Sequence, residues 1–344
     1  MNDIKRENNG KKKIAVLCNG LGVVQRGAET FAIEFEKHLK NDFDIQLFGV
    51  KDTNTKTRNQ IKLPWRNGRA YLESYYFGKH LYKYHMLDEF DIILNNAGFP
   101  GSYWCNKQRK RTGTPFINRA RGGGREEKIS ILFKPNHTVF LTQFHCEKTT
   151  KKSNTSVIPN AIDINITKEK STIIESFEPP YFLSTSALVS FKRIPLLIDA
   201  VKQYGRGTLI QTSTGNLKDE IIDYGKKHLG DRFQYLGIIK KEELDKLYNS
   251  CDIFLLASKR EAFGVVYLEA MSHNLPVITE SDERRKEIVG SAGYLLDCRN
   301  KRDFSGLIEE TLNKNWKDIP KRQVEKFSWN NIKEQYKKLI EEIQ

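Results

Sequence analysis

The sequence predicts an α/β fold built from two domains, each with a parallel sheet covered by helices. Its 344 residues exceed what one ordinary α/β layer holds. Short apolar runs alternate with segments of helical period, which is typical of parallel sheets with helices on both faces. The alternation stops in the polar segment 164–180 and then restarts. We therefore predict a first domain over residues 1–165 and a second over residues 166–326, with an inter-domain linker at 164–180 and a terminal helical segment after them.

The first half begins with a polar, charged arm at residues 1–13 and continues as strands and helices in turn. We expect strands at Lys13–Asn19, Ile45–Val50, Ile92–Asn95, Pro115–Asn118 and Val139–Leu141. We expect helices at Ala28–Leu39, where the apolar residues share one face, and at the tyrosine-rich segment Arg69–Leu87. Residues 51–67 are polar and rich in turn-forming residues, which predicts a surface loop.

The second half repeats the pattern. Strands are expected at Tyr181–Thr185, Thr208–Thr212, Phe233–Leu236, Ile253–Leu256 and Pro276–Thr279. Helices are expected at Ile194–Tyr204, Lys218–Leu229, Glu242–Ser250 and the segment that follows Ile253–Leu256. From Lys317 to Gln344 the chain reads mostly as amphipathic helix, since Trp329, Ile332, Tyr336, Leu339 and Ile343 fall close to one stripe.

The basic charge of the chain is unevenly distributed. Residues 1–165 carry 28 Lys and Arg against 16 Asp and Glu, whereas the rest of the chain carries 29 against 27. An acidic partner for the first half would be an anionic membrane face, a phosphate-linked acceptor or nucleic acid. Solvated surface charge explains the excess equally well. We predict no nucleic-acid binding, because no RNA- or DNA-binding module is recognisable and aromatic residues are not interleaved with the basic runs.

Cysteine and histidine usage argues against a disulfide framework or a metal site. The five cysteines are scattered with no C-x-x-C pair, and the seven histidines lack ligand spacing. No D-x-D stands in a plausible metal position. No apolar window reaches the ~18–20 residues that a spanning helix needs, and no apolar signal segment opens the chain. We expect a cytoplasmic protein without metal or cofactor.

The segment Ser258–Met271 is the strongest candidate for a site. It follows the apolar run Ile253–Leu256 and places Glu261 and Glu269 on either side of a Phe-Gly turn. A glycine at a strand-to-helix turn lets a ligand approach the backbone, and the free N–H groups of the first helical turn suit a phosphate. Carboxylates near such a turn could instead hold sugar or ribose hydroxyls.

Two further positions have weaker signals. Lys192 lies between a strand and a helix and could reach a diphosphate, although an isolated lysine is more often a surface residue. Gly27 opens a helix and could let a diphosphate or acceptor approach it, although a plain tight turn is at least as probable. A dinucleotide fingerprint is absent, because the position of its third glycine is Gln25.

Taken together, the second half resembles glycosyltransferase family 4, whose members are retaining enzymes of the GT-B fold with an E-x7-E motif. The segment Glu261–Ala270 matches the form E-x-F-G-x-x-x-x-E-A. Lys192, Leu275-Pro276-Val277-Ile278 and Glu287-Ile288-Val289 follow the family's order, and the likeness covers most of residues 155–300. It implies two Rossmann-like domains facing a central cleft, with a C-terminal helix at 327–344 that crosses back to the first domain.

The resemblance also assigns roles to residues. Glu261 would hold sugar hydroxyls and Lys192 would offset charge on the departing diphosphate, as the catalytic pair. Donor binding would involve Glu269 at the ribose, the N–H groups of Phe263, Gly264 and Val265, Gly237 and Ile238 near the base, and Gly27.

Two departures from the family pattern affect this assignment. Ala187 stands where the family often has an arginine, and Arg193 is a candidate to replace that arginine at the diphosphate. No histidine occupies the usual place in the first domain. There, Arg119 and Arg121 would line the acceptor side, or belong to a basic surface loop.

The resemblance implies a metal-independent hexosyltransferase that moves a sugar from a nucleoside-diphosphate sugar, as co-substrate, to a glycan or lipid-linked acceptor in cell-surface polysaccharide or glycoconjugate biosynthesis. The first domain would bind the acceptor and the second the nucleotide sugar, with peripheral contact to an anionic inner-membrane face. The alternatives are a GT-B phosphorylase, a nucleotide-sugar epimerase and a non-catalytic basic binding protein.

Overall fold

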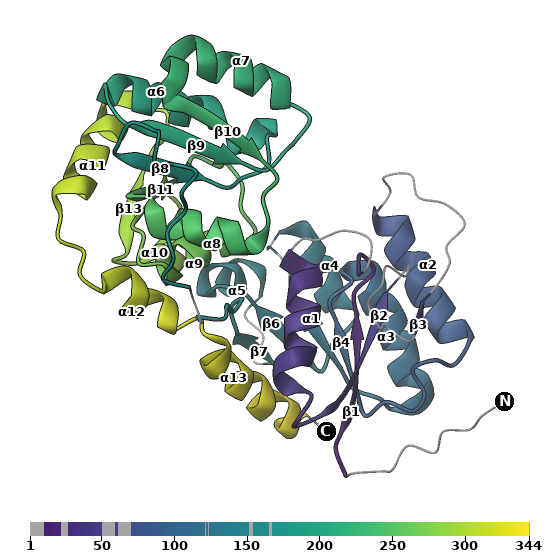
Figure 1. Cartoon of the computed structure of the whole chain (residues 1–344). Coiled ribbons are helices and arrows are strands. Elements are labelled where there is room, and N and C mark those ends of the chain that lie inside the picture. The colour runs from purple at the N-terminus through teal and green to yellow at the C-terminus, as the bar shows by residue number, and fades with distance from the viewer. Residues whose placement is uncertain are drawn as a thin grey trace. The chain divides into compact units, whose positions relative to one another are not determined.

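The computed structural model describes two compact units (Figure 1). The described residues are 10–21, 27–49, 59–60, 70–120, 122, 124–150, 154–164 and 167–343. One unit comprises Met1–Asn160 with Trp329–Gln344, and the other comprises Ala161–Ser328. The chain therefore passes between the units after Asn160 and again after Ser328, where the sequence predicted residues 165 and 326.

The first unit is built on a seven-stranded sheet in the order β3-β2-β1-β4-β5-β6-β7, with every neighbouring pair parallel. Its strands are β1 Lys13–Leu17, β2 Asp44–Gly49, β3 Asn59–Gln60, β4 Ile92–Asn95, β5 Phe116–Arg119, β6 His137–Phe140 and β7 Thr155–Val157. Its helices are α1 Gly27–Leu39, α2 Ala70–Lys83, α3 Phe99–Thr112, α4 Arg125–Leu132, α5 Gln143–Thr149 and α13 Trp329–Glu342.

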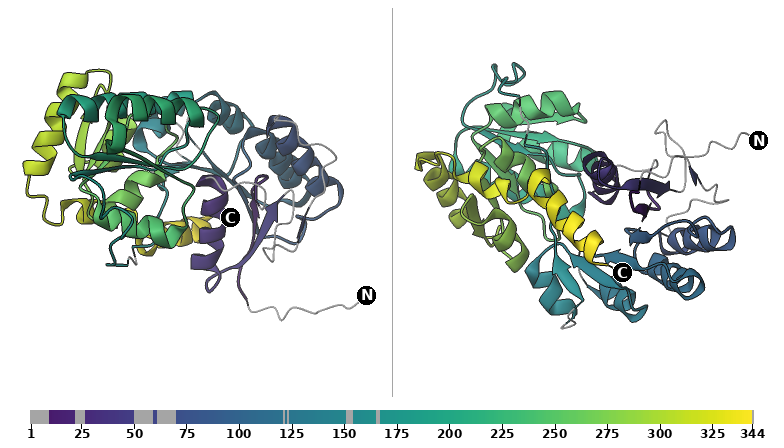
Figure 2. Two further views of the ribbon diagram at one scale, coloured as in Figure 1. Left: turned by 45° about the horizontal axis from the view of Figure 1, so that its top comes forward. Right: turned by 90° about the horizontal axis from the view of Figure 1, so that it is seen from below.

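The C-terminal helix α13 packs on α1 within this first unit (Figures 1 and 2). Aromatic rings make the contact: Phe31 stacks with Trp329 at 6.0 Å between centroids, and Phe35 meets Tyr336 edge-on at 5.2 Å. Aromatic pairs of this geometry add to the apolar area that they bury. The return of the C-terminal helix to the first domain is thus confirmed.

The second unit has a six-stranded parallel sheet in the order β10-β9-β8-β11-β12-β13. Its strands are β8 Tyr181–Ser184, β9 Thr208–Thr212, β10 Phe233–Gly237, β11 Ile253–Leu256, β12 Val277–Glu280 and β13 Gly293–Leu296. Its helices are α6 Ile194–Tyr204, α7 Lys218–Leu229, α8 Lys241–Ser250, α9 Val265–Ser272, α10 Glu283–Val289, α11 Lys301–Asn313 and α12 Ile319–Glu325, with 3-10 turns η1 Ser190–Lys192 and η2 Gly230–Arg232.

The topology of this second sheet identifies where a ligand should bind. From β8 the chain proceeds outward through β9 to β10, and it then returns to place β11 on the other side of β8. In open parallel sheets, ligands bind outside the carboxyl ends of the strands at such a reversal. Helices pack on both faces, with α6, α7 and α11 in one layer and α9, α10 and α12 in the other (Figure 2). The loops after β8 and β11 therefore form the expected site.

Two sequence predictions need correction. The described residues of the predicted linker 164–180 pack into the second unit, since the Ser171 N–H donates to Ser250 Oγ at 2.8 Å and Ile174 is buried. Polar residues there form hydrogen bonds with α8, which a search for apolar periodicity does not detect.

In the predicted loop 51–67, Asn59–Gln60 pairs with β2 as an edge strand, and the rest lies outside the described residues. The terminal segment 317–344 is mostly helical, as predicted, and contains the two helices α12 and α13.

Among the described residues, no helix combines the length and the apolar character required to cross a bilayer.

A close backbone contact fixes the loop after β8. The Leu188 N–H donates to the Thr214 carbonyl at 3.1 Å, and the Leu188 carbonyl accepts from the Leu217 N–H at 3.0 Å. A Cβ at Gly215 would lie 2.2 Å from the Leu188 carbonyl oxygen, so only glycine permits this approach. The loop that leads to Lys192 is thereby held against the loop after β9.

We expect Gly215→Ala to destabilise the protein by about 1–3 kcal/mol, because the added methyl group must displace backbone at Leu188. Thermal unfolding measures the effect. Gly306→Ala in α11 is the matched control: its Cβ meets nothing within 4 Å, and alanine favours a helix interior by about 0.5–1 kcal/mol over glycine. Equal melting temperatures for Gly215→Ala and the wild type would contradict the close contact.

Candidate functional site

The loops after β8 and β11 meet through an ion pair. Lys192 Nζ lies 2.5 Å from Glu261 Oε1, and both side chains are only 14% exposed. A backbone hydrogen bond of 2.8 Å from the Lys259 N–H to the Phe191 carbonyl joins the same two loops. Residues 69 positions apart in the sequence, predicted separately as the catalytic pair, thus lie in direct contact.

The start of α9 presents backbone donors beside this pair. Gly264 precedes the helix in a left-handed conformation with φ of 90°. The Phe263 ring is 2% exposed and contacts Phe327 edge-on at 6.0 Å between centroids, so it anchors the loop in the core. The N–H groups of Phe263, Gly264 and Val265 precede the first intrahelical hydrogen bonds of α9, which makes them available to an anion.

Glu269 lies on α9 and is held by a tyrosine. Tyr248 Oη donates to Glu269 Oε2 at 3.2 Å and lies 3.0 Å from Thr185 Oγ1. Burial raises the pKa of Glu269 above the ordinary glutamate value, while Lys241 and the Tyr248 hydrogen bond act in the opposite direction. Burial and the Glu269 carboxylate raise the pKa of Tyr248 well above its usual value, so the phenol remains a donor. Sequence reasoning missed Tyr248 and Thr185.

His273 packs against Tyr248. Its ring stacks on Tyr248 with 5.3 Å between centroids. Nδ1 lies 2.7 Å from Asn249 Oδ1, and Nε2 lies 3.3 Å from Asp245. Burial lowers the pKa of His273 to about 4, so the imidazole is neutral at neutral pH. We therefore assign His273 to the packing of the site.

Gly237 and Ile238 lie at the carboxyl end of the edge strand β10. Gly237 has a φ of 67°, and its carbonyl accepts from the Ser213 N–H at 2.6 Å. The register between β10 and β9 shifts at this point. Ile238 is 78% exposed. Its apolar surface is available to a flat base, and its role there remains a prediction.

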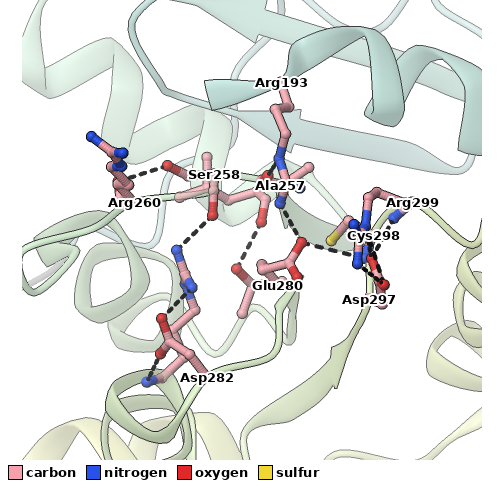
Figure 3. A network of polar contacts seen from close by, with 12 residues as sticks. Arg193, Ala257, Ser258, Arg260, Glu280, Asp282, Asp297, Cys298 and Arg299 are labelled. Atoms are coloured by element: carbon pink, nitrogen blue, oxygen red, sulfur yellow. Dashed lines mark hydrogen bonds and ion pairs between the residues drawn. The ribbon is translucent and has the colours of Figure 1, made fainter. Parts of the chain in front are cut away.

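Arg193 is engaged inside the second unit (Figure 3). Its Nε donates to the Ala257 carbonyl at 2.6 Å, and its guanidinium pairs with Glu280. It occupies a left-handed conformation with φ of 53° between η1 and α6. Because these partners take up its guanidinium, the structure does not favour Arg193 as the replacement for an arginine at Ala187.

Arg119, predicted on the acceptor side, is only 3% exposed. Its guanidinium donates to Tyr336 Oη at 3.3 Å, to Asn96 Oδ1 at 3.2 Å and to the Asn160 side chain. It also lies over the Phe31 ring at 3.5 Å from the centroid. These contacts place Arg119 in the packing between α1 and α13, and nothing in them supports a role at the acceptor.

The two other residues predicted in the first unit are less informative. Arg121 lies outside the described residues. Gly27 is the exposed first residue of α1, and a Cβ there would meet nothing within 4 Å. Donor contact by Gly27 stays a prediction.

The second unit also has a cavity of about 800 Å³ at the start of α6, α7 and α10. Among the predicted site residues that the structure describes, only Arg193 lies in its wall. Basic and acidic side chains share that wall: Arg193, Lys259, Arg284, Arg285 and Arg299 with Glu220, Glu280 and Asp282.

Comparison with known proteins finds a family model that matches the part of the chain with this geometry. Residues 165–328 match the family model of the glycosyl transferases group 1. The same segment contains the Lys192–Glu261 pair and Glu269. The match covers the second unit, so the sequence prediction of a glycosyltransferase domain is supported at the level of this group.

One relative and two solved structures extend the comparison. The chain is 30% identical over 206 residues to a probable sucrose-phosphate synthase of Thermosipho melanesiensis, over 55% of this chain and 48% of the relative. A sucrose-phosphate synthase structure from Thermosynechococcus elongatus matches with a TM-score of 0.77 and 16% identity, over 96% of this chain and 98% of the other. The Anabaena protein HepE in complex with UDP matches with a TM-score of 0.76 and 17% identity, over 96% and 99%.

These comparisons confirm the predicted GT-B fold class, since the solved structures match nearly the whole chain. At identities below 20% they show the fold alone. The chain spans about half the length of the curated relative quoted above. Donor, acceptor and reaction therefore have to be argued from the residues of this chain.

The raised pKa of Glu269 predicts a pH dependence of nucleotide binding. An ionised carboxylate is the better acceptor for two hydroxyls. Because the pKa lies above that of an exposed glutamate, Glu269 takes up a proton earlier as the pH falls. We expect affinity for a nucleoside diphosphate to be full at neutral pH and to fall on the acid side of neutrality.

Calorimetric titration between about pH 5 and 8 measures this affinity. Glu269→Gln is the matched control, because it keeps the shape, removes the titration and experiences the same protonation of the ligand phosphates. Parallel pH profiles for the wild type and Glu269→Gln would show that Glu269 does not titrate with binding.

Proposed function

We propose that the protein is a retaining glycosyltransferase of family 4, which transfers a sugar from a nucleoside-diphosphate sugar to a glycan or lipid-linked acceptor without a metal ion. The observation that carries the proposal is the Lys192–Glu261 pair at the head of α9, with Glu269 farther along the same helix. This arrangement lies at the carboxyl ends of the strands of the second unit. Residues 165–328 of that unit match the family model of the glycosyl transferases group 1. A hexosyl donor with a uridine base is the first candidate, since a protein of the same fold was solved with UDP.

The donor contacts follow from the chemistry of each group. Glu269 would accept from the ribose hydroxyls, with its carboxylate oriented by Tyr248. The N–H groups of Phe263–Val265 would donate to the diphosphate at the helix start. Glu261 would accept from sugar hydroxyls, which brings the anomeric carbon close to Lys192.

Transfer would then proceed at the face of the sugar from which the diphosphate leaves. The bond between the anomeric carbon and the diphosphate oxygen breaks, and a bond from the acceptor oxygen to the same carbon forms. The departing diphosphate takes the acceptor proton. Negative charge builds up on the diphosphate as it leaves, so Lys192 and the α9 N–H groups would stabilise the transition state more than the ground state.

The acceptor proposal rests on charge and on the surface of α2. The basic excess of the chain lies in residues 1–165. On α2, Tyr71 and Leu72 are 52% and 46% exposed, and Lys79 and Lys83 are exposed on the same helix. Tyrosine and lysine side chains suit a membrane interface with anionic lipid. We propose peripheral contact with the inner face of an anionic membrane, where a lipid-linked acceptor of cell-surface polysaccharide synthesis would be found.

Variants of the ion pair test the catalytic assignment. We expect Lys192→Ala and Glu261→Ala each to lower kcat about 100-fold or more, because loss of one positioned electrostatic contact at a transition state has effects of that order. Release of nucleoside diphosphate from a panel of sugar nucleotides, with acceptors present, measures the rate. Glu283→Gln, an exposed glutamate in the same unit, is the control and should keep full activity.

Proton NMR of the product tests retention, since the anomeric configuration of the donor should be preserved. An inverted product would overturn the retaining mechanism but not the fold. Activity that persists in both Lys192→Ala and Glu261→Ala would overturn the site. If the wild type released nucleoside diphosphate with no donor and acceptor combination, the phosphorylase, epimerase and binding-protein alternatives would take precedence.

Co-sedimentation with vesicles tests the membrane contact. We expect the protein to bind phosphatidylglycerol vesicles, to ignore phosphatidylcholine vesicles and to be released as salt rises, because exposed charge is screened by ions. The double variant Lys79→Glu/Lys83→Glu should bind much less. Lys226→Glu/Lys227→Glu on α7 makes the same charge change on the second unit and should bind normally. Binding that ignores lipid charge and salt would remove the proposal.

A further inference from the structure

The loop that carries Glu261 is held by arginines at three of its backbone carbonyls. Arg193 Nε donates to the Ala257 carbonyl at 2.6 Å, and Arg285 Nη2 donates to the Ser258 carbonyl at 2.6 Å. Arg284 Nη1 donates to the carbonyl of Glu261 itself at 2.8 Å. We call these three residues the arginine clamp.

Two carboxylates, Glu280 at the end of β12 and Asp282 just after it, pair with the three guanidiniums of the arginine clamp. Glu280 pairs with Arg193 and also accepts from the Cys298 N–H at 3.4 Å. Asp282 Oδ2 accepts from Arg284 at 3.0 Å and from Arg285 at 2.7 Å. Asp282 also caps α10 by accepting the Arg285 N–H at 2.9 Å. Each guanidinium therefore bridges a fixed carboxylate and a loop carbonyl.

The shape of arginine suits this bridge. Its planar fork donates in two directions at once, whereas a lysine ammonium is a point charge on a flexible stem. Carbonyls in a strand-to-helix loop have no ladder partner, so they must be satisfied by side chains or water. A fourth carbonyl of this loop, that of Arg260, accepts from Ser258 Oγ at 2.9 Å.

Glu261 is consequently held at both ends. Its carboxylate pairs with Lys192, and its carbonyl accepts from Arg284. The side chain of Arg285 is 1% exposed and also donates to Tyr267 Oη on α9 at 3.0 Å, so its removal would disturb the core. The side chain of Arg284 is 23% exposed. Arg284 is thus the member of the clamp that can be changed with least effect on folding.

We infer that Arg284, fixed by Asp282, is a positioning residue for Glu261. This inference rests on the proposed function of Glu261 at the donor sugar. Arg284 contacts the backbone of Glu261, so it would act on the reaction only through the placement of that carboxylate. Errors of ~1 Å in the position of a reacting group reduce rates by about 100-fold. The nucleoside diphosphate would be held by Lys192, by Glu269 and by the N–H groups at the start of α9, so its binding would be affected little.

The first experiment measures kinetics of Arg284→Ala. We expect kcat to fall at least tenfold, while the Kd for a free nucleoside diphosphate changes less than threefold. Arg284→Lys restores one donor without the fork and should recover only part of kcat. Asp282→Asn keeps a side chain that caps helices but removes the negative charge that fixes Arg284, so it should also lower kcat. Lys286 on the same helix pairs with the exposed Glu283. Lys286→Ala is therefore the matched control, and its kcat should be unchanged.

The second experiment measures hydrogen exchange and does not require activity. Peptides that cover residues 257–262 should exchange faster in Arg284→Ala than in the wild type and in Lys286→Ala. Peptides from β11 and from the interior of α9 should be unchanged. A general increase across the second unit would mean that Arg284 is a stability residue only, which would overturn the inference.

The two experiments separate failure of the inference from failure of the proposed function. If the wild type is active and Glu261→Ala is not, unchanged kcat in Arg284→Ala overturns the inference alone. A loss of kcat with unchanged exchange at 257–262 also overturns it, because Arg284 would then act by direct contact with substrate. If the wild type transfers no sugar, the proposed function fails, and the exchange experiment still decides whether Arg284 fixes the loop.

Discussion

The ion pair between Lys192 and Glu261 is the contact on which the rest of the site depends. It joins the loop after β8 to the loop after β11, and these strands lie at the point where the strand order reverses. Both charges are largely removed from water, so each needs the other to offset its desolvation. The pair therefore fixes the relative position of two loops, of which only the loop of Glu261 has a strong signal in the sequence.

Ion pairs also position the charged side chains around this pair. Glu280 and Asp282 stand at the end of β12 and hold arginines that reach back to the loop of Glu261. Tyr248 donates to Glu269 on α9 and stacks on the neutral His273. The groups proposed to contact the donor are thus supported by rigid elements of one unit, as a site that discriminates between ground state and transition state requires.

The sequence predicted the local pattern well because that pattern is set by local physics. The helices α6 and α7 and the strands β9 and β11 begin and end at the predicted residues. Apolar patterning marks all four, and neighbouring glycines also mark α6, α7 and β9. Glu261 and Glu269 were found through their spacing around the Phe-Gly turn. The spacing could not reveal that Glu261 pairs with Lys192, because that contact joins residues on different βα units.

Long-range contacts of ordinary-looking polar residues were beyond prediction. Arg119 reads as part of a basic loop, yet it is buried beneath α13, a helix more than 200 positions later in the chain. Arg284 and Arg285 read as part of a charged helix, yet they bond to the carbonyls of the Glu261 loop. The function of such residues is decided by tertiary packing, which composition and periodicity do not encode.

The central claim is that the second unit binds a nucleoside-diphosphate sugar through Lys192, Glu261 and Glu269. A thermal-shift screen of sugar nucleotides that differ in base and sugar tests it most directly, because a ligand that binds the folded state raises the melting temperature. The account predicts that nucleotides of one base raise the melting temperature of the wild type in a concentration-dependent way, and that Lys192→Ala and Glu269→Ala abolish the shift. No shift with any sugar nucleotide at millimolar concentration, or an equal shift in both variants, would contradict it.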